Sequence, residues 1–166
     1  MCNFRPNEII DRFDKLDINA HAKMGFNAIL VDIDNTIDYP DSLNPGTKEA
    51  FKFLDKLEKN GFKVILFSNN TKERVERFLD GHKYSYNYWS LKPLPFAYYK
   101  VIKKFNLDIH KTMSLGDQLI TDCLGANFVG IYSVYSKQLV EKDIIKTKFN
   151  RVIERFIFKY ILHEKM

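Results

Sequence analysis

Short apolar runs alternate with longer amphipathic segments along most of this chain. Five runs have the length and composition of buried strands: residues 26–31, 63–67, 84–89, 112–115 and 128–134. Apolar side chains recur at helical spacing in residues 47–60, 71–79 and 94–105. Strands that alternate with helices predict a parallel sheet covered on both faces. We therefore predict an α/β fold, a Rossmann-like three-layer α/β/α sandwich around a mostly parallel, five-stranded sheet.

The chain has 166 residues, which suits one domain over residues 1–166. Within it, we expect residues 1–25 to form a helical lead-in and residues 148–163 to form a basic amphipathic helix. In the second segment apolar side chains recur at helical spacing, with lysines and arginines on the other faces. Two explanations stay open for this helix: it packs on the sheet, or it contacts an anionic membrane surface.

Positive charge is concentrated toward the C-terminus. The net charge is +5, and residues 130–166 hold eight Lys or Arg against four Asp or Glu. Such an excess favours an anionic partner, namely a substrate phosphate, a nucleic acid or a lipid surface. The alternative is a solubilising face with no specific partner.

The cysteines and the hydropathy pattern exclude several classes of protein. Cys2 and Cys123 form no Cys-x-x-Cys pair, which argues against a disulfide framework and a thiolate zinc site. Residues 1–12 lack the apolar core of a signal peptide, and no apolar run reaches about 18 residues. We expect a cytoplasmic protein, either unattached or peripheral at the membrane.

Polar side chains follow each of the first four predicted strands. The carboxyl ends of parallel strands meet at one edge of a sheet, where ligands bind. Carboxylates gathered there repel one another unless a cation lies among them, and oxygen ligands select a hard ion such as Mg²⁺. The sequence therefore predicts a magnesium site at this edge. The candidate residues are Asp32, Asp34, Asn35, Ser68, Asn69, Lys92, Asp117 and Asp122.

These residue types suit phosphoryl transfer. Asp32 can attack phosphorus and form an aspartyl-phosphate, while Asp34 protonates the leaving oxygen and later activates water. Lys92 balances the remaining negative charge and binds a phosphate oxygen. Ser68 and the backbone N–H groups around Asn35 and Asn69 can hold the other phosphoryl oxygens.

Four motifs in order resemble those of the haloacid dehalogenase (HAD) superfamily. They are Asp32-Ile33-Asp34-Asn35-Thr36, Ser68, Lys92-Pro93 and Gly116-Asp117 with Asp122. Over about residues 4–156 the chain is most similar to the YqeG-like, HAD IIIA-type phosphatases, a group related to mitochondrial phosphatidylglycerophosphatases. The resemblance implies a Mg²⁺-dependent phosphomonoester hydrolase.

The resemblance also implies a role for each site residue. Asp32, Asp34 and Lys92 would be catalytic, and Asp32, Asp34 and Asp117 would hold Mg²⁺, with Asp34 using its backbone carbonyl. Asp122 would hold Lys92 or a metal-bound water. The residues implied to bind the substrate phosphate are Asn35, Ser68, Asn69 and Lys92.

The intervals between the motifs leave no room for a cap domain. Only a flap, residues 37–46, lies near the expected site, and its acids Asp38 and Asp41 would disfavour a strongly anionic leaving group. An open site takes its specificity from a large substrate or a neighbouring surface. The candidates are a phospholipid such as phosphatidylglycerophosphate, a phosphoprotein, or a small metabolite in a pocket completed by homo-oligomerisation.

Two other functions stay open. One is a binding or assembly module for nucleic acid or ribonucleoprotein with weak phosphatase activity; the other is a phosphotransferase or mutase. The retained Asp32 and Asp34 favour hydrolysis over the binding module. Tyr84, Tyr86, Tyr88 and Trp89 either pack as a strand face or stack on the substrate.

Overall fold

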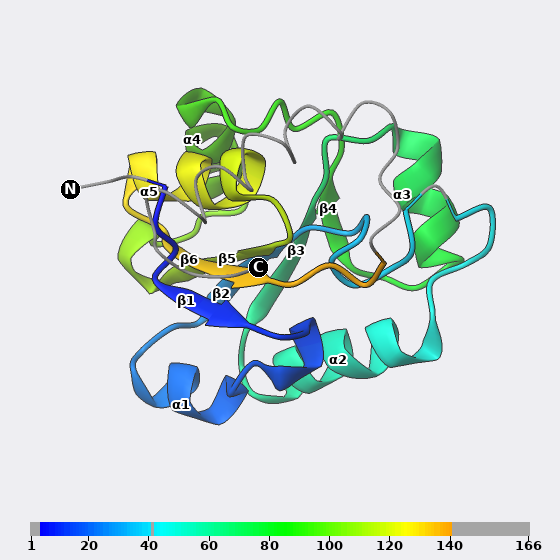
Figure 1. Ribbon diagram of the computed structural model, residues 1–166, viewed down its shortest axis with the longest axis horizontal. Helices are drawn as coiled ribbons and strands as arrows, with labels where there is room; N and C mark the ends of the chain where they lie inside the picture. Colours follow the sequence, from blue (N-terminus) through cyan, green and yellow to red (C-terminus); the bar gives the residue numbers. More distant parts are fainter. Residues whose placement is uncertain (1–3, 41, 141–166) are drawn as a thin grey trace.

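A computed structural model describes residues 4–40 and 42–140. They form one sheet of six parallel strands with flanking helices (Figure 1). The strands are β1 (Glu8–Ile10), β2 (Ala28–Val31), β3 (Lys63–Phe67), β4 (Ser85–Asn87), β5 (Thr112–Gly116) and β6 (Tyr132–Ser136). The α-helices are α1 (Ile18–Lys23), α2 (Lys48–Lys59), α3 (Lys72–Leu79), α4 (Pro95–Lys104) and α5 (Gly125–Val129). Short 3₁₀ turns cover Phe13–Lys15 and Ile109–Lys111, and a π-helix covers Leu119–Leu124.

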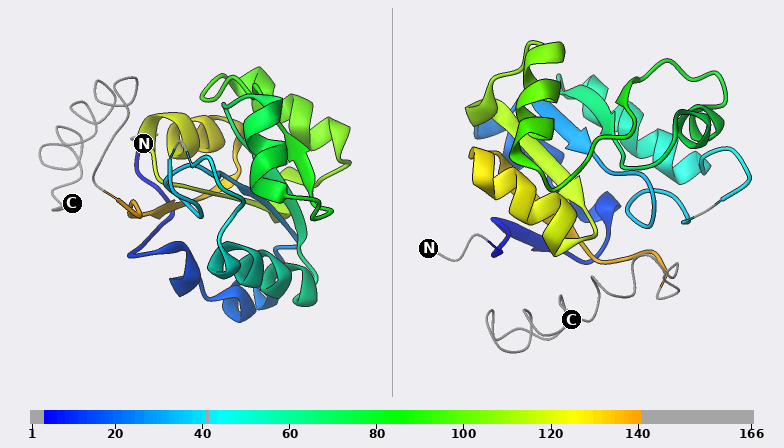
Figure 2. Two further views of the ribbon diagram at one scale, coloured as in Figure 1. Left: turned by 90° about the vertical axis from the view of Figure 1, so that its right-hand side faces the viewer. Right: turned by 90° about the horizontal axis from the view of Figure 1, so that it is seen from above.

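The central strands are buried on both faces because successive side chains meet different helix layers. In β2, Ile29 and Val31 pack into the same cluster as the apolar side of α2, whereas Leu30 packs with α4 and α5. Figures 1 and 2 show α1 and α2 on one side of the sheet and α4 and α5 on the other. The predicted three-layer α/β/α sandwich with a parallel sheet is confirmed.

The sheet has six strands rather than the predicted five. The additional strand, β1, lies at one edge and pairs with β6 in the order β1-β6-β5-β2-β3-β4. It falls in residues 1–25, where we expected a helical lead-in and where the α-helix covers only Ile18–Lys23. A strand of three residues is too short to show the alternation of apolar and polar side chains that indicates a strand. Its pairing partner is also far away in the sequence, since Glu8 pairs with Val134. Local sequence therefore could not indicate this strand.

The last strand also begins later than predicted. We expected a strand over residues 128–134, but Phe128 and Val129 end α5 and β6 begins at Tyr132. Gly130 separates the two elements with φ of 81°, a left-handed conformation that glycine adopts without steric cost and that ends helices. The apolar run thus consists of the end of a helix and the start of a strand.

The strand order identifies the edge where a ligand would bind. From β2 the chain proceeds to β3 and β4 on one side, and then returns to β5 on the other side of β2. Open parallel sheets bind ligands at such a change of direction, which lies here at the carboxyl ends of β2 and β5. Asp32 directly follows β2, and Asp117 directly follows β5.

Within residues 4–40 and 42–140, the motifs are connected by single helices, strands and loops, and no cap domain is inserted. In the same residues, no helix combines the length and the apolar character needed to cross a bilayer. The basic helix predicted over residues 148–163 lies outside the described part of the chain, and so does Asp41.

Gly125 is required by the close approach of α4 and α5. A Cβ at this position would lie 2.5 Å from Tyr98 Cε2 and 3.0 Å from the Pro93 carbonyl oxygen. We expect Gly125→Ala to lower the free energy of unfolding by about 1–3 kcal/mol, measured by urea denaturation, because overpacking displaces Tyr98. The control is Phe128→Ala on the exposed side of α5. An unchanged midpoint for Gly125→Ala would contradict the tight contact.

Candidate active site

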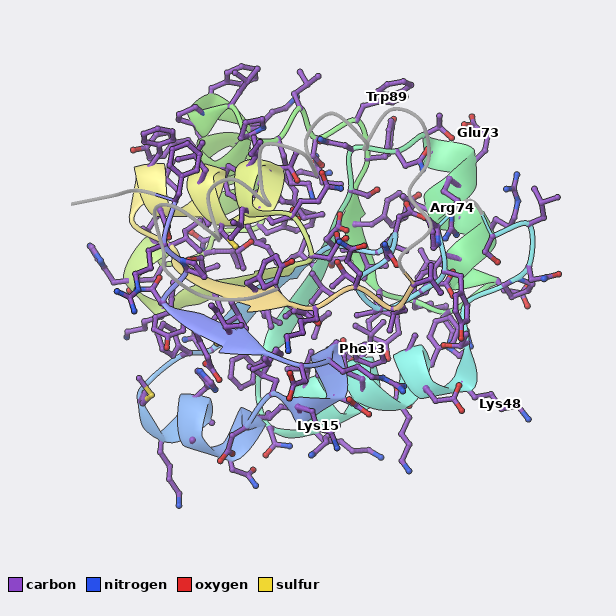
Figure 3. All side chains as sticks on the ribbon, viewed as in Figure 1. Phe13, Lys15, Lys48, Glu73, Arg74 and Trp89 are labelled. Carbon is purple, nitrogen blue, oxygen red and sulfur yellow. The ribbon has the colours of Figure 1, made fainter. Side chains whose placement is uncertain are left out.

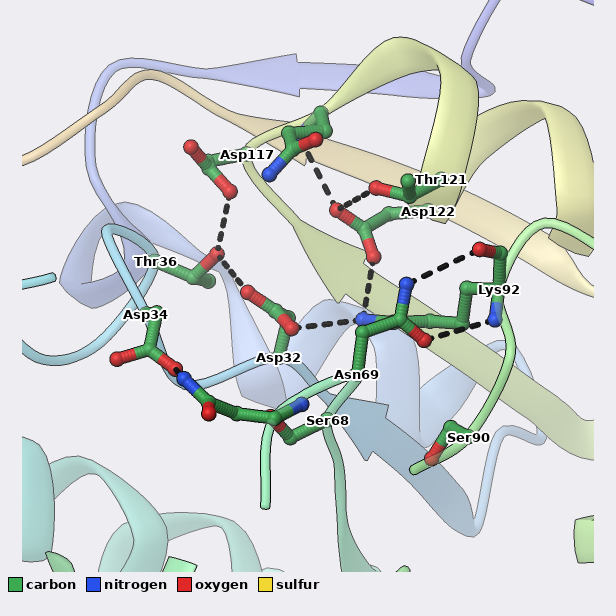
Figure 4. A network of polar contacts seen from close by, with 12 residues as sticks. Asp32, Asp34, Thr36, Ser68, Asn69, Ser90, Lys92, Asp117, Thr121 and Asp122 are labelled. Carbon is green, nitrogen blue, oxygen red and sulfur yellow. Dashed lines mark hydrogen bonds and ion pairs between the residues drawn. The ribbon is translucent and has the colours of Figure 1, made fainter. Parts of the chain in front are cut away.

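Three carboxylates converge at the carboxyl edge of the sheet. Asp32 follows β2, Asp117 follows β5 and Asp122 lies in the π-helix (Figure 4). Their oxygen atoms include a set within 4.8 Å of one another, and the residues are 9%, 0% and 2% exposed. The structure thus brings together Asp32 and Asp117, two of the three expected metal ligands. It adds Asp122 to the group, while the side chain of the third, Asp34, contacts other residues.

Lys92 lies between two of these carboxylates. Its Nζ donates to Asp32 Oδ1 at 2.6 Å and to Asp122 Oδ1 at 2.7 Å, and the residue is buried. The second oxygen of Asp122 accepts from the Gln118 N–H at 3.1 Å and from the Thr121 hydroxyl at 3.3 Å. Asp122 is therefore oriented by the chain around it and fixes the position of the Lys92 ammonium.

The cluster carries more negative than positive charge. Burial raises the pKa of Asp32 to about 7, because desolvation and the nearby Asp122 and Asp34 outweigh the attraction of Lys92. Burial alone would lower the Lys92 pKa, but the attraction of Asp122 and Asp32 is stronger and the net pKa is raised. Three carboxylates against one ammonium leave a deficit of positive charge. This donor set fits a hard divalent cation such as Mg²⁺.

Thr36 is a site residue that the sequence reasoning missed. Its hydroxyl lies 3.1 Å from Asp32 Oδ2 and 3.3 Å from Asp117 Oδ1. A hydroxyl has one hydrogen, so it donates to one of these oxygens at a time and orients the two carboxylates toward each other. The signal was present in the sequence, since Thr36 stands in the first motif four residues after Asp32.

The side-chain amides of Asn69 and Asn35, two of the predicted phosphate-binding residues, bond to the protein itself. The Asn69 side chain donates to the Lys92 carbonyl at 3.0 Å and accepts the Lys92 N–H at 2.8 Å. The Asn35 side chain makes the same pair of bonds with Val140, both at 3.0 Å, and its N–H donates to the Asp38 carbonyl at 2.7 Å. These two side-chain amides support Lys92 and the loop after Asp32, and phosphate binding by backbone N–H groups near Asn69 stays a prediction.

Ser68 lies closer to the expected arrangement. It directly follows β3, is 1% exposed, and its Oγ accepts the Asn70 N–H at 3.0 Å. Figure 4 places Ser68 on the opposite side of Asp32 from Asp122. An accepting hydroxyl keeps its own hydrogen for donation, so Ser68 can donate to a phosphoryl oxygen beside Asp32.

Asp34 and the flap are joined by Arg74, which sequence reasoning also missed. Arg74 Nη2 lies 2.8 Å from Asp34 Oδ1 and 2.9 Å from Asp38 Oδ2. Asp38 is 0% exposed, and its burial raises its pKa although Arg74 opposes the shift. The expectation that Asp38 would repel an anionic leaving group is therefore wrong, because its carboxylate is buried against a guanidinium.

Comparison with known proteins gives a consistent result. The family model for haloacid dehalogenase-like hydrolases matches residues 6–130, which include every site residue described above except the contact at Val140. The chain is 28% identical over 154 residues to the probable phosphatase YqeG of Bacillus subtilis (strain 168), covering 93% of this chain and 89% of that protein.

Solved structures show the same fold. An uncharacterized protein from Listeria monocytogenes serotype 4b aligns with a TM-score of 0.57 and 17% identity, over 72% of this chain and 86% of that chain. The cobalt-bound deoxy-D-mannose-octulosonate 8-phosphate phosphatase from Haemophilus influenzae aligns with a TM-score of 0.53 and 12% identity, over 81% and 88%. The chain therefore belongs to the haloacid dehalogenase-like hydrolase family.

Proposed function

We propose that the protein hydrolyses phosphomonoesters with Asp32 as the nucleophile and Mg²⁺ as the cofactor. The observation that carries this proposal is the buried contact of Asp32 with Lys92, beside Asp117 at the carboxyl edge of the sheet. Lys92 holds one Asp32 oxygen and Thr36 lies against the other, so the carboxylate is oriented before substrate binds.

In the first step a bond forms between an Asp32 oxygen and phosphorus, and the bond from phosphorus to the leaving oxygen breaks. Asp34 gives a proton to that oxygen. In the second step water attacks phosphorus, Asp34 accepts the water proton, and the Asp32 carboxylate is released with inorganic phosphate. Lys92 and Ser68 hold phosphoryl oxygens during both steps. Mg²⁺ held by Asp32, Asp117 and the Asp34 carbonyl would neutralise charge on those oxygens.

Asp32→Asn tests the nucleophile. The amide keeps the size of the carboxylate but cannot form the phosphoenzyme, so we expect turnover of 4-nitrophenyl phosphate to fall on the order of a thousandfold or more. The control is Asp11→Asn, a carboxylate at the surface. Full activity in Asp32→Asn would refute the covalent mechanism.

Removal of divalent cations tests the cofactor. We expect EDTA to abolish turnover and added Mg²⁺ to restore it, because the carboxylates alone repel the substrate phosphate. Asp117→Asn should raise the Mg²⁺ concentration needed for half-maximal activity, by about tenfold or more if one ligand charge is lost. Activity that is indifferent to chelation would rule out the metal role.

The surface beside Lys92 supports an amphiphilic substrate. Tyr88, Trp89, Leu91 and Phe96 are 41%, 60%, 52% and 55% exposed. They line a hollow of about 350 Å³ together with Lys100 and other residues of α4 and the preceding loop. Figure 3 shows Trp89 at the outer rim of the molecule. Exposed aromatic side chains next to a site mark an interaction surface.

This surface favours a phospholipid monoester among the substrates considered above. Aromatic side chains insert at the boundary of a bilayer, while Lys100 and Lys104, which also line the hollow, suit anionic headgroups. Of the two interpretations of Trp89 and Tyr88, their exposure favours contact with substrate over core packing. We propose phosphatidylglycerophosphate as the representative of this class.

Vesicle sedimentation tests the surface. We expect the protein to sediment with vesicles of anionic phospholipid and less with neutral ones, and Trp89→Ala with Phe96→Ala to weaken binding several-fold. Met24→Ala, exposed at the end of α1, is the matched control. Absence of binding, or phosphatase activity confined to soluble metabolites or phosphopeptides, would reject the lipid substrate.

A further inference from the structure

Arg74 occupies a position that is unfavourable for a cation. It is the third residue of α3, after the N-cap Thr71, whose hydroxyl accepts the Arg74 N–H at 3.3 Å. The N-terminus of a helix carries partial positive charge, so a cation in the first turn is destabilising there. The side chain is also 5% exposed, and burial of an unpaired guanidinium would be costly. Its contacts must compensate both effects.

Those contacts converge on Asp34 and the start of the flap. Nε donates to Asp34 Oδ1 at 3.0 Å, and Nη2 lies 2.8 Å from the same oxygen. Nη2 also donates to Asp38 Oδ2 at 2.9 Å and lies within 3.3 Å of the Tyr39 carbonyl. The backbones of Asp34 and Asp38 form a bridge of their own. One guanidinium therefore fixes the Asp34 carboxylate relative to the turn that leads into the flap.

The two oxygens of Asp34 have different surroundings. Oδ1 faces the guanidinium through two donors, whereas Oδ2 accepts a single bond, from the neutral Asn70 amide at 3.2 Å. The guanidinium therefore occupies Oδ1, and Oδ2, with one neutral contact, is the Asp34 oxygen left to contact a substrate.

We infer that Arg74 is a positioning residue that directs Asp34 Oδ2 at the leaving oxygen. The inference rests on the proposed phosphatase function. As the Asp32–phosphorus bond forms and the bond to the leaving oxygen breaks, the proton on Asp34 Oδ2 passes to that oxygen. Arg74 touches neither substrate nor the reacting atoms; it acts by holding Oδ1 and the flap.

A pair of substrates separates this role from a structural one. The leaving oxygen of 4-nitrophenyl phosphate departs as a stable anion and needs no proton, whereas that of benzyl phosphate needs one. For Arg74→Met we expect kcat/KM to fall on the order of 100-fold with benzyl phosphate, the range of general acid catalysis, and less than about tenfold with 4-nitrophenyl phosphate. Arg77→Met, an exposed arginine on the same helix, is the matched control.

A second comparison keeps the test decisive if Arg74→Met unfolds. Arg74→Lys keeps the charge with fewer donors, and we expect an intermediate loss confined to benzyl phosphate. In an Asp34→Asn background, either Arg74 change should cause little additional loss. Equal losses on both substrates, or full losses in the Asp34→Asn background, would overturn the positioning role while leaving the phosphatase intact. Wild-type protein inactive on both substrates would instead reject the proposed function, and this inference with it.

Discussion

The Lys92 ammonium, buried between Asp32 and Asp122, is the interaction on which the site depends. A buried cation needs close, well-oriented partners, and several features of the fold provide them. The Asn69 side chain bonds both backbone groups of Lys92. At Gly116 a Cβ would lie 2.2 Å from Asp122 Cγ, so only a residue without a side chain leaves room for that carboxylate. The end of β5 is therefore shaped by the carboxylate that holds the lysine.

The elements that could be predicted are those whose signal lies within a short stretch of sequence. Apolar runs identified β2, β3 and β5, and the rule that ligands bind at strand ends led to Asp32, Lys92 and Asp117. The strand β1 and the contact of Arg74 with Asp34 carried no such signal. Each depends on segments far apart in sequence, and a single arginine in an amphipathic helix looks like any solvent-exposed one. The bonds between the Asn35 side chain and Val140 could not be predicted either, because the motif around Asn35 carries no information about a residue 105 positions later.

The polar side chains of the site fall into two groups, those that meet at the sheet edge and those that hold these in place. Asp32, Lys92 and Asp117 face one another at the sheet edge, while Asn35, Asn69, Asp122 and Arg74 hold their neighbours in place. Such supporting contacts make a preorganised site, in which little rearrangement is needed on binding. Because no cap is inserted in the described residues, the exposed aromatic side chains near Lys92 are the nearest surface able to contact the rest of a substrate.

The hydrogen bonds between Asn35 and Val140 also affect how the protein folds. Asn35 lies 105 residues before Val140. Likewise, β1 pairs with β6 through Glu8 and Val134, which are 126 positions apart. Contacts of this span form only after long loops have closed, which slows folding. The loop that carries Asp32 is therefore anchored at Asn35 only after these distant segments have met.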